Sequence, residues 1–413
     1  MKTVLAIETS CDETGIAYVR HTDGGDYISL ANALHSQIDA HAPYGGVFPM
    51  LAKREHGSNL VGLLAAAQVK ALANKVSFEN VSFTEEQITT ALAHLEREQE
   101  LMEICKKELE ENPEGVFHKK PDIDALVVTA GPGLEPALWV GISFVKALSV
   151  LWNIPILPVN HMEGHIASVL LSKKEEVVFP ALALLISGGH TELVSISTWG
   201  QYEVIGKTRD DAVGEAYDKA ARILGLPYPG GPAISKEAEM MRNTFTKADI
   251  EAMCVKYSIK LPRPMLKSQD MDFSFSGLKT AVLYLVRDIM KVINIVGAEE
   301  LPEEILNLIC YEFEEAVVDV ITGKLNFAYA HNRNIKTLIV AGGVIANSYI
   351  RTHIDAWCED KEIFCFKPEF DLATDNAVMI GLAGLLGIER DLPYVEDFSK
   401  LIARGGWKID EVY

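Results

Sequence analysis

The sequence predicts a duplicated α/β fold, because two kinds of local unit each occur twice along the chain. A strand, a polar turn and a second strand occupy residues 3–19, and the same order returns at residues 181–196. A strand, a glycine turn and a helix begin at Ile123 and again at Ile335. Two halves with the same order of elements indicate two related domains that face a nucleotide cleft.

Glycine turns follow predicted buried strands in both halves. The clearest are Thr129-Ala130-Gly131-Pro132-Gly133, Ser187-Gly188-Gly189 and Ala341-Gly342-Gly343. Glycine lets backbone N–H groups approach phosphate oxygens, often beside the N-terminus of a helix. Tight turns use glycine for steric reasons about as often, so a single turn is weak evidence. Their occurrence in both halves favours a nucleotide-binding site.

The length and composition are typical of a soluble globular protein. The 413 residues are enough for two domains with separate cores, and 48% of them are hydrophobic and 23% charged. The 58 acidic residues outnumber the 38 basic ones and give a formal net charge of −20. This charge argues against a broad basic surface for nucleic acid, but it leaves open RNA binding through a local patch or a partner subunit.

Cysteine usage and hydropathy predict a reduced, cytoplasmic chain with no membrane association. Six cysteines are scattered without any C-x-x-C spacing, which argues against a disulfide framework or a zinc knuckle. The apolar run from Val4 to Ile7 is interrupted by Glu8, so no signal peptide is predicted. The longest apolar stretch, residues 377–388, is too short to span a bilayer and predicts a buried helix.

The predicted domains are residues 1–172 and residues 173–370. A C-terminal helix and tail, residues 371–413, are expected to return to the first domain. A polar crossover, residues 170–178 with a Lys-Lys-Glu-Glu run at 173–176, connects the two domains.

The segment of about residues 76–120 differs in character from the rest of the first domain. Thr84 and Gln87 have the spacing of a capping box, and the charged helical stretch after them ends at Asn112-Pro113. We expect a solvated helical hairpin inserted in the first domain, and a partner-docking arm is the alternative.

His161 and His165 are the strongest candidates for metal ligands. Four residues apart on a helix, they lie about 40° apart around its axis, so both imidazoles can reach one metal ion. The zinc-peptidase motif H-E-x-x-H places its general base next to the first histidine. Glu163 comes one position later, about 200° around the helix from His161, and is expected to point away from the metal. A chance pair of histidines is the alternative.

Ten segments of the chain carry longer motifs. They are residues 7–14 (IETSCDET), 43–47 (PYGGV), 129–134 (TAGPGL), 160–165 (NHMEGH), 187–191 (SGGHT), 211–219 (DAVGEAYDK), 228–232 (YPGGP), 272–280 (DFSFSGLKT), 341–347 (AGGVIAN) and 374–377 (TDNA). In sequence and order they resemble the motifs of the universal family of tRNA threonylcarbamoyladenosine transferases, the TsaD/Kae1/Qri7 family. The SGGHT and DFSFSGLKT forms are similar to those of bacterial or organellar, TsaD-like members.

The resemblance implies the actin/Hsp70/sugar-kinase fold, which agrees with the duplication. It implies that the threonylcarbamoyl group of threonylcarbamoyl-AMP passes to N6 of adenine 37 in tRNAs that read ANN codons. It also implies one divalent metal held by His161, His165 and Asp375, with Fe²⁺ favoured and Zn²⁺ possible. Two histidines and one carboxylate leave coordination positions open, as a catalytic metal site requires. An N-cap aspartate is the alternative for Asp375, which precedes an apolar helix.

The resemblance assigns a set of second-half residues to the adenylate. They are Leu185, Ile186, Ser187, Gly188, Gly189, Asp218, Gly231 and Asn347. The turn Ser187-Gly188-Gly189 would present N–H groups to phosphate or carbamoyl oxygens, and Asp218 would accept hydrogen bonds from ribose hydroxyls. Asn347 has donors and an acceptor for adenine or ribose, but an asparagine at a helix start is equally a cap.

Asp12 and Glu13, in the turn of the first half, are expected to give catalytic support. Carboxylates exposed to water in a turn are the alternative. No Ser-His-Asp or Cys-His spacing argues for a covalent intermediate.

The resemblance further implies tRNA as a substrate, TsaB-like and TsaE-like protein partners, and a separate TsaC or Sua5 enzyme that makes the adenylate. The chain departs from the family pattern at Glu135-Pro136, at Met50 and in its long insertion. These departures are expected to affect the contacts with partner proteins before they affect the catalysed reaction.

Three rival functions remain. An ATPase or kinase of the same fold needs no histidine pair, and a metallopeptidase needs a glutamate in a different position. A non-catalytic nucleotide-binding scaffold would be expected to have lost part of the metal triad, whereas His161, His165 and Asp375 are all present.

Overall fold

The structure is a computed structural model in which residues 1–171 and 176–413 are described. The chain divides into two compact units, unit 1 (Met1–Glu175 and Thr374–Tyr413) and unit 2 (Glu176–Ala373). The C-terminal segment therefore belongs to unit 1. The predicted boundary at 172/173 and the Lys-Lys-Glu part of the predicted crossover lie outside the described residues.

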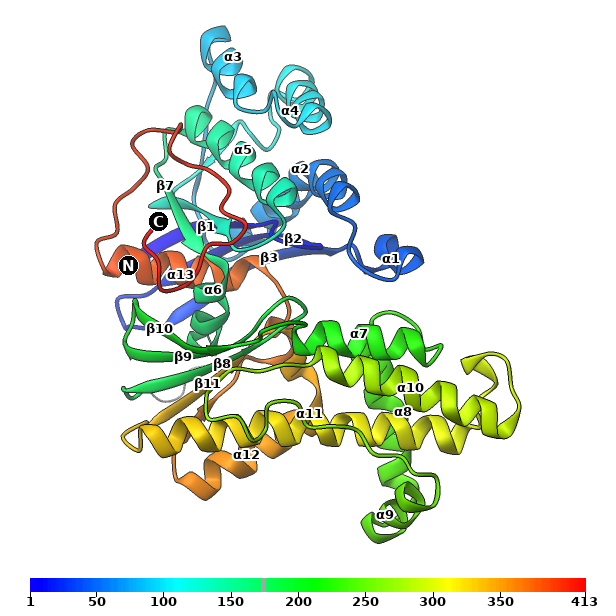
Figure 1. Cartoon of the computed structure of the whole chain (residues 1–413). Coiled ribbons are helices and arrows are strands. Elements are labelled where there is room, and N and C mark those ends of the chain that lie inside the picture. Colours follow the sequence, from blue (N-terminus) through cyan, green and yellow to red (C-terminus); the bar gives the residue numbers. More distant parts are fainter. Residues whose placement is uncertain (172–175) are drawn as a thin grey trace. The chain divides into compact units, whose positions relative to one another are not determined.

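Unit 1 is built on a five-stranded sheet with the order β3-β2-β1-β6-β7 (Figure 1). Its strands are β1 Lys2–Glu8, β2 Glu13–His21, β3 Tyr27–Ser36, β6 Ala125–Gly131 and β7 Ile156–Asn160. The first three strands pair antiparallel, whereas β6 is parallel to β1 and β7 is parallel to β6.

Unit 2 repeats this topology in the order β10-β9-β8-β11-β12. Its strands are β8 Ala181–Ile186, β9 Thr191–Thr198, β10 Gln201–Lys207, β11 Thr337–Ala341 and β12 Phe364–Phe366. Again the first three strands pair antiparallel and the last two are parallel. The two matching sheets confirm the predicted duplicated α/β fold class.

Helices cover both faces of the sheet in unit 1. The elements are α1 Ile38–His41, η1 Ala42–Tyr44, α2 Pro49–Ala73, β4 Phe78–Asn80, α3 Glu85–Ala93, α4 Gln99–Glu111, β5 Lys119–Pro121, α5 Glu135–Trp152, α6 His161–Ala167, η2 Ser168–Leu170 and α13 Ala377–Glu389. Leu5 and Leu126 belong to the core formed with α2 and α5, whereas Ala6 and Val127 contact α13. Successive side chains of a strand point to opposite faces, so a strand buried on both faces is apolar throughout.

Unit 2 has its main core on the helix-bearing face of its sheet. The elements are α7 Val213–Ile223, α8 Gly230–Thr244, α9 Lys247–Lys256, α10 Ser276–Ile293, η3 Ala298–Glu300, α11 Glu303–His331, η4 Gly343–Ala346, α12 Ser348–Lys361 and η5 Phe370–Leu372. Leu184 and Val340 from the sheet join a core with Tyr217 of α7, Phe313 of α11 and Ile354 of α12.

The inserted segment forms the predicted pair of helices, α3 and α4. Thr84 and Gln87 make both hydrogen bonds of the predicted capping box, and α4 ends at its C-cap Asn112. The prediction of a solvated hairpin is only half right, because Leu101 and Cys105 of α4 are buried in the core of unit 1. One apolar face therefore fixes the insertion to the unit.

The predicted buried helix at 377–388 is confirmed as α13. The helix predicted after Gly131-Pro132-Gly133 is also confirmed, as α5, and among the described residues it is the helix long and apolar enough to cross a membrane by length and composition alone. Of α5, 72% is buried within the structure, as expected for a core helix. Pro136, a departure from the family pattern, lies in its first turn, where proline is favoured.

Gly381→Ala is expected to destabilise unit 1, because a Cβ at Gly381 would lie 2.5 Å from Cγ2 of Val19. Overpacking of a core costs about 1–3 kcal/mol. Gly62→Ala on α2 is the matched control, since a Cβ there meets nothing within 4 Å and alanine stabilises a helix by about 0.5–1 kcal/mol. Urea unfolding measures both differences, and equal stability of the two variants would contradict the close packing of α13.

Candidate functional site

The two histidines occupy the first turns of α6, directly after β7. Asn160 ends the strand and caps the helix, because its side chain accepts hydrogen bonds from the N–H groups of Met162 and Glu163. Both imidazoles are buried, and their ring centroids are 4.7 Å apart. As predicted, Glu163 faces a different group: its carboxylate pairs with Arg390 at 2.7 Å.

Asp375 lies beside both histidines. Its Oδ1 is 3.1 Å from Nε2 of His165 and 3.5 Å from Nε2 of His161. Asn376 caps α13 by accepting a hydrogen bond from the N–H of Met379. The N-cap role considered for Asp375 therefore belongs to its neighbour.

Close helix packing brings these residues together although more than 200 residues separate them in sequence. A Cβ at Gly164 of α6 would lie 2.9 Å from Cδ1 of Ile380 on α13. A Cβ at Gly15 of β2 would lie 2.9 Å from the backbone N of Ala377. Gly15 needs to be glycine because the close atom is backbone, whereas a Cβ at Gly164 would require the end of the Ile380 side chain to shift. The start of α13, and Asp375 with it, is thereby held against the histidine helix.

The donor set fits a divalent transition metal. His161, His165 and Asp375 each offer one ligand atom, and these atoms lie within 4.8 Å of one another. Both ring nitrogens of His165 are buried without a hydrogen bond, although Nε2 faces Asp375. A buried ring nitrogen without a hydrogen bond calls for a missing partner, and a metal ion would supply one.

Glu8, at the end of β1, is a site residue that the sequence reasoning missed. Its buried carboxylate accepts hydrogen bonds from the backbone N–H of Ser10 and the hydroxyl of Thr129. Its Oε2 lies 3.4 Å from Nδ1 of His161, and the hydroxyl of Ser10 lies 3.2 Å from the same nitrogen. Contacts to one ring nitrogen orient a metal-binding imidazole so that its other nitrogen can face the metal. The available signal was a carboxylate directly after the apolar run from Val4 to Ile7.

The charges around His161 favour its protonated form when no metal is bound. Burial disfavours the imidazolium, but Asp375 and Glu8 outweigh burial and raise the pKa of His161 to about 9. Burial likewise opposes ionisation of Glu8, yet His161 lowers the pKa of Glu8 below its ordinary value. A metal ion that binds Nε2 must therefore displace a proton from His161.

Asp12 ends the turn between β1 and β2, and Glu13 is the first residue of β2; both belong to the same unit as the histidines. Both are half-buried, so they are not the fully exposed turn carboxylates of the alternative interpretation. Burial, followed by the charges of Asp12 and Asp375, raises the pKa of Glu13 well above its ordinary value. Burial and the Asp12 charge also raise the pKa of the Cys11 thiol, which disfavours a thiolate nucleophile there.

In unit 2, the turn Ser187-Gly188-Gly189 follows the buried strand end at Leu185 and Ile186. A Cβ at Gly188 or Gly189 would meet nothing within 4 Å, so the backbone is open on this side. The first turn of α7 approaches the same place, since a Cβ at Gly214 would lie 2.8 Å from Cα of Gly188. An open glycine turn beside a helix N-terminus is suited to binding an anion.

The other predicted adenylate residues lie at the starts of α8 and α12. Asp218 accepts a hydrogen bond from the N–H of Gly230, and a Cβ at Gly231 would meet nothing within 4 Å. Asn347 caps α12 by accepting from the N–H groups of residues 349 and 350. Its amide nitrogen donates to Ser235 and Glu314, so the capping alternative is what the structure shows.

The glycine turns are not equivalent. From the sequence, all of them are interpreted as turns that let backbone N–H groups approach a phosphate, and this interpretation does not hold for every turn. A Cβ at Gly131 would lie 2.0 Å from the carbonyl oxygen of Arg404, and the N–H of Gly133 donates to the carbonyl of Gly405. Gly342 packs in the same way against the backbone of Ile186. These glycines allow close backbone packing, and the open turn is the one at Gly188.

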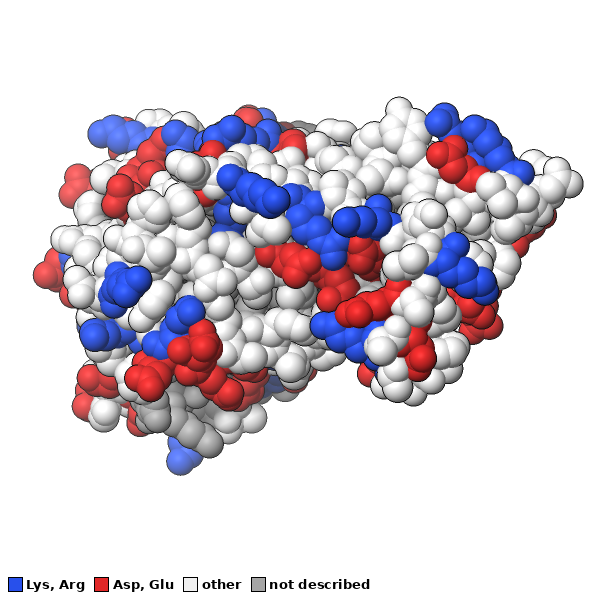
Figure 2. Space-filling view, turned by 60° about the horizontal axis from the view of Figure 1, so that its bottom comes forward, with Lys and Arg blue, Asp and Glu red and all other residues white. Residues whose placement is uncertain are grey.

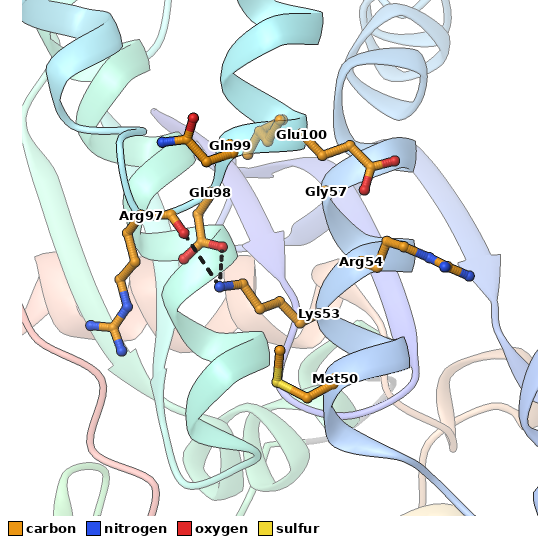
Figure 3. Close-up of a pocket in the computed structure, with 9 residues that line it drawn as sticks. Met50, Lys53, Arg54, Gly57, Arg97, Glu98, Gln99 and Glu100 are labelled. Atoms are coloured by element: carbon orange, nitrogen blue, oxygen red, sulfur yellow. Dashed lines mark hydrogen bonds and ion pairs between the residues drawn. The ribbon is translucent and has the colours of Figure 1, made fainter.

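A separate pocket of about 340 Å³ lies between α2 and the start of α4 in unit 1 (Figure 3). Within it Lys53 pairs with Glu98 at 2.8 Å and donates to the carbonyl of Arg97. Met50, another departure from the family pattern, lines the pocket. No His or Cys is among the described residues that line it.

Comparison with known proteins gives consistent matches over most of the chain. A family model described as TsaD, tRNA N6-adenosine threonylcarbamoyltransferase, matches residues 89–382. The tRNA N6-adenosine threonylcarbamoyltransferase of Chromobacterium violaceum is 40% identical over 94% of this chain and 93% of its own length. That of Nitrosospira multiformis is 38% identical over 98% of this chain and 97% of its own length. Among solved structures, a full-length HypF in its phosphate- and nucleotide-bound form is 12% identical, with a TM-score of 0.43, and the match covers 94% of this chain and 47% of HypF.

Glu8→Gln is expected to weaken metal binding by about 10–100-fold, because it removes the carboxylate behind His161. Glu163→Gln is the matched control on the histidine helix and should keep wild-type affinity, since Glu163 pairs with Arg390 instead. Titration with Zn²⁺ against a competing chelator measures both affinities. Equal affinities of the two variants would show that Glu8 does not support the site.

Proposed function

Because the chain belongs to the family of tRNA N6-adenosine threonylcarbamoyltransferases, we propose that it forms the threonylcarbamoyl modification at adenine 37 of tRNAs that read ANN codons. The donor is threonylcarbamoyl-AMP, and the acceptor is the exocyclic N6 amine. The observation that carries the proposal is the grouping of His161, His165 and Asp375 in a chain that aligns with these transferases over nearly its full length.

We propose these three side chains as the ligands of one divalent metal, with Fe²⁺ favoured and Zn²⁺ possible. When bound, the ion supplies a Lewis acid that can polarise the donor carbonyl or hold its phosphate. Glu8 and Ser10 hold the His161 ring from its Nδ1 side.

Asp12 and Glu13 are the proposed proton acceptors. The N6 amine must lose a proton as its bond to the carbamoyl carbon forms and the bond from that carbon to the AMP oxygen breaks. A carboxylate with a raised pKa holds a proton more tightly than an ordinary one, so in its ionised form it is a stronger base. The raised pKa of Glu13 supports this role.

Unit 2 is proposed to hold the adenylate. The open turn Ser187-Gly188-Gly189, at the end of the strand with Leu185 and Ile186, would donate N–H groups to phosphate or developing carbamoyl oxygens. Asp218 would accept from ribose hydroxyls, and the open backbone at Gly231 would let the nucleotide approach. Asn347 would contribute by fixing the start of α12, where its capping hydrogen bonds already place it.

The position of Glu163 supports a transferase over a metallopeptidase. A peptidase needs a carboxylate that can activate water at the metal. Glu163 is instead paired with Arg390, whereas Asp375 lies beside the two histidines.

The charge of the chain supports a need for helper proteins in a cytoplasmic reaction. With a net charge of −20, it has few cations to spare for a polyanion. On the face in Figure 2, Lys and Arg are interspersed with Asp and Glu. We therefore propose that TsaB-like and TsaE-like partners supply part of the surface that binds tRNA.

Reconstitution tests the proposed function. The chain, an adenylate-forming enzyme, threonine, bicarbonate, ATP, an ANN-reading tRNA and the helper proteins are incubated, and nucleosides are analysed by mass spectrometry. Wild type should form threonylcarbamoyladenosine, and His161→Ala should lose at least about a hundredfold in rate together with its metal, because a ligand is removed. Full activity and full metal content in His161→Ala would contradict the proposed site. Casein cleavage that disappears in the same variant would favour a peptidase, and tRNA-independent ATP hydrolysis that disappears would favour an ATPase.

A further inference from the structure

A chain of buried hydrogen bonds connects the start of α2 with the Asp12–Glu13 turn in unit 1. The backbone N–H of Phe48 donates to Nδ1 of His41 at 3.3 Å, and Nε2 of His41 lies 3.1 Å from Oε1 of Gln37. Nε2 of Gln37 lies 3.2 Å from Nδ1 of His56, and Nε2 of His56 lies 3.0 Å from the carbonyl oxygen of Cys11. The three side chains are thus joined end to end between two backbone groups.

The two backbone groups fix the direction of every hydrogen bond between them. A backbone N–H can only donate, so Nδ1 of His41 accepts the hydrogen bond from Phe48. Nε2 of His41 therefore carries the hydrogen and donates a hydrogen bond to Oε1 of Gln37. A carbonyl can only accept, so Nε2 of His56 carries a proton and its Nδ1 accepts from the amide of Gln37. The hydroxyl of Thr14, 2.7 Å from the same Nδ1, is a second donor. One arrangement of protons satisfies the whole chain, and both histidines are neutral in it.

The chain is shielded from solvent. His41, His56 and Thr14 are fully buried, and Gln37 is 1% exposed. Burial lowers the pKa of His56 to about 4, which agrees with a neutral imidazole. Buried polar groups joined in a complete network specify one arrangement of the backbone around them.

The far end of the chain is the turn that carries the proposed proton acceptors. Three successive carbonyls lead into this turn, and each one accepts a hydrogen bond. Those of Ser10 and Asp12 accept from the backbone N–H groups of Leu134 and Gln37, at 2.8 and 2.9 Å. The carbonyl of Cys11 accepts from a side chain, that of His56.

We propose that His56 and Gln37 are positioning residues for the transfer reaction: they hold the Asp12–Glu13 turn in its working orientation through the carbonyl of Cys11. The inference rests on the proposed function, since it assumes that this turn serves the reaction. Through His41 the same chain of hydrogen bonds connects this turn with the end of α1 and, at Phe48, with the start of α2.

The test compares His56→Leu with His56→Gln in the reconstituted reaction with the full set of partners. His56→Leu removes the donor to Cys11 and should lower kcat by about a hundredfold, the cost of a misplacement of about 1 Å in an active site. The KM for threonylcarbamoyl-AMP and the metal content should stay within about twofold of wild type, because a positioning defect acts on the transition state. His56→Gln keeps an N–H near the position of Nε2 and should restore most of the rate.

A matched control separates positioning from general destabilisation. Gln68→Leu removes another buried side chain of α2, one that donates to the carbonyl of Val116. It should lower the melting temperature about as much as His56→Leu does and leave kcat unchanged. Thr14→Val is nearly isosteric, so it should fold normally, and it should lower kcat about tenfold because His56 loses one donor.

Wild-type kcat in both His56→Leu and Thr14→Val would overturn the inference. An equal loss of kcat in Gln68→Leu and His56→Leu would overturn it too, since the effect would then be one of stability. Absence of the modified nucleoside with the wild-type chain would instead contradict the proposed function, and the inference would fall with it.

Discussion

The packing of α13 against the sheet and α6 of unit 1 is the constraint on which the candidate metal centre depends. This helix is apolar on all sides, and it can lie close to β1, β2 and β6 because glycines stand where side chains would collide. Gly381 and Gly384 meet Val19 and Val127, with no room for a Cβ. Because the helix cannot shift without opening these contacts, the residue before its cap is held in one place. Asp375 is that residue, so the same packing that stabilises the core sets its distance to the two histidines.

The resulting site brings several negatively charged side chains close together. Glu8, Asp12, Glu13 and Asp375 lie around one histidine pair, and like charges in a buried region cost free energy unless cations or protons offset them. Asp375 and Glu8 raise the pKa of His161 against the effect of burial, and burial with the charges of Asp12 and Asp375 raises the pKa of Glu13. A divalent cation would offset the same negative charge. Proton uptake and metal binding at this site would therefore both offset the same negative charge.

Much of the fold followed from the sequence because it depends on local patterns. The repeated strand and turn order predicted two matching sheets, and the spacing of His161 and His165 placed them on one side of a helix. Other features depend on contacts between segments distant in sequence. Glu8 could not be predicted from the sequence, because its role depends on the contact between its carboxylate, at the end of β1, and Nδ1 of His161. Asp375 was found through family resemblance, since no local pattern distinguishes it from a cap, and in the structure the cap is Asn376.

The glycines show most clearly why a motif needs its three-dimensional context. In unit 1, Gly131 and Gly133 sit against the C-terminal tail, and Gly164 allows two helices to touch. In unit 2, Gly188 and Gly189 face open space beside the first turn of α7. Close packing is not confined to unit 1, because Gly342 of unit 2 packs against the backbone of Ile186. The same residue type thus serves two purposes, close backbone packing at Gly131 and Gly342 and an open backbone at Gly188, and a sequence motif alone does not separate them. The proposed metal and adenylate sites can therefore lie in different halves of a duplicated fold without any change in the order of its strands.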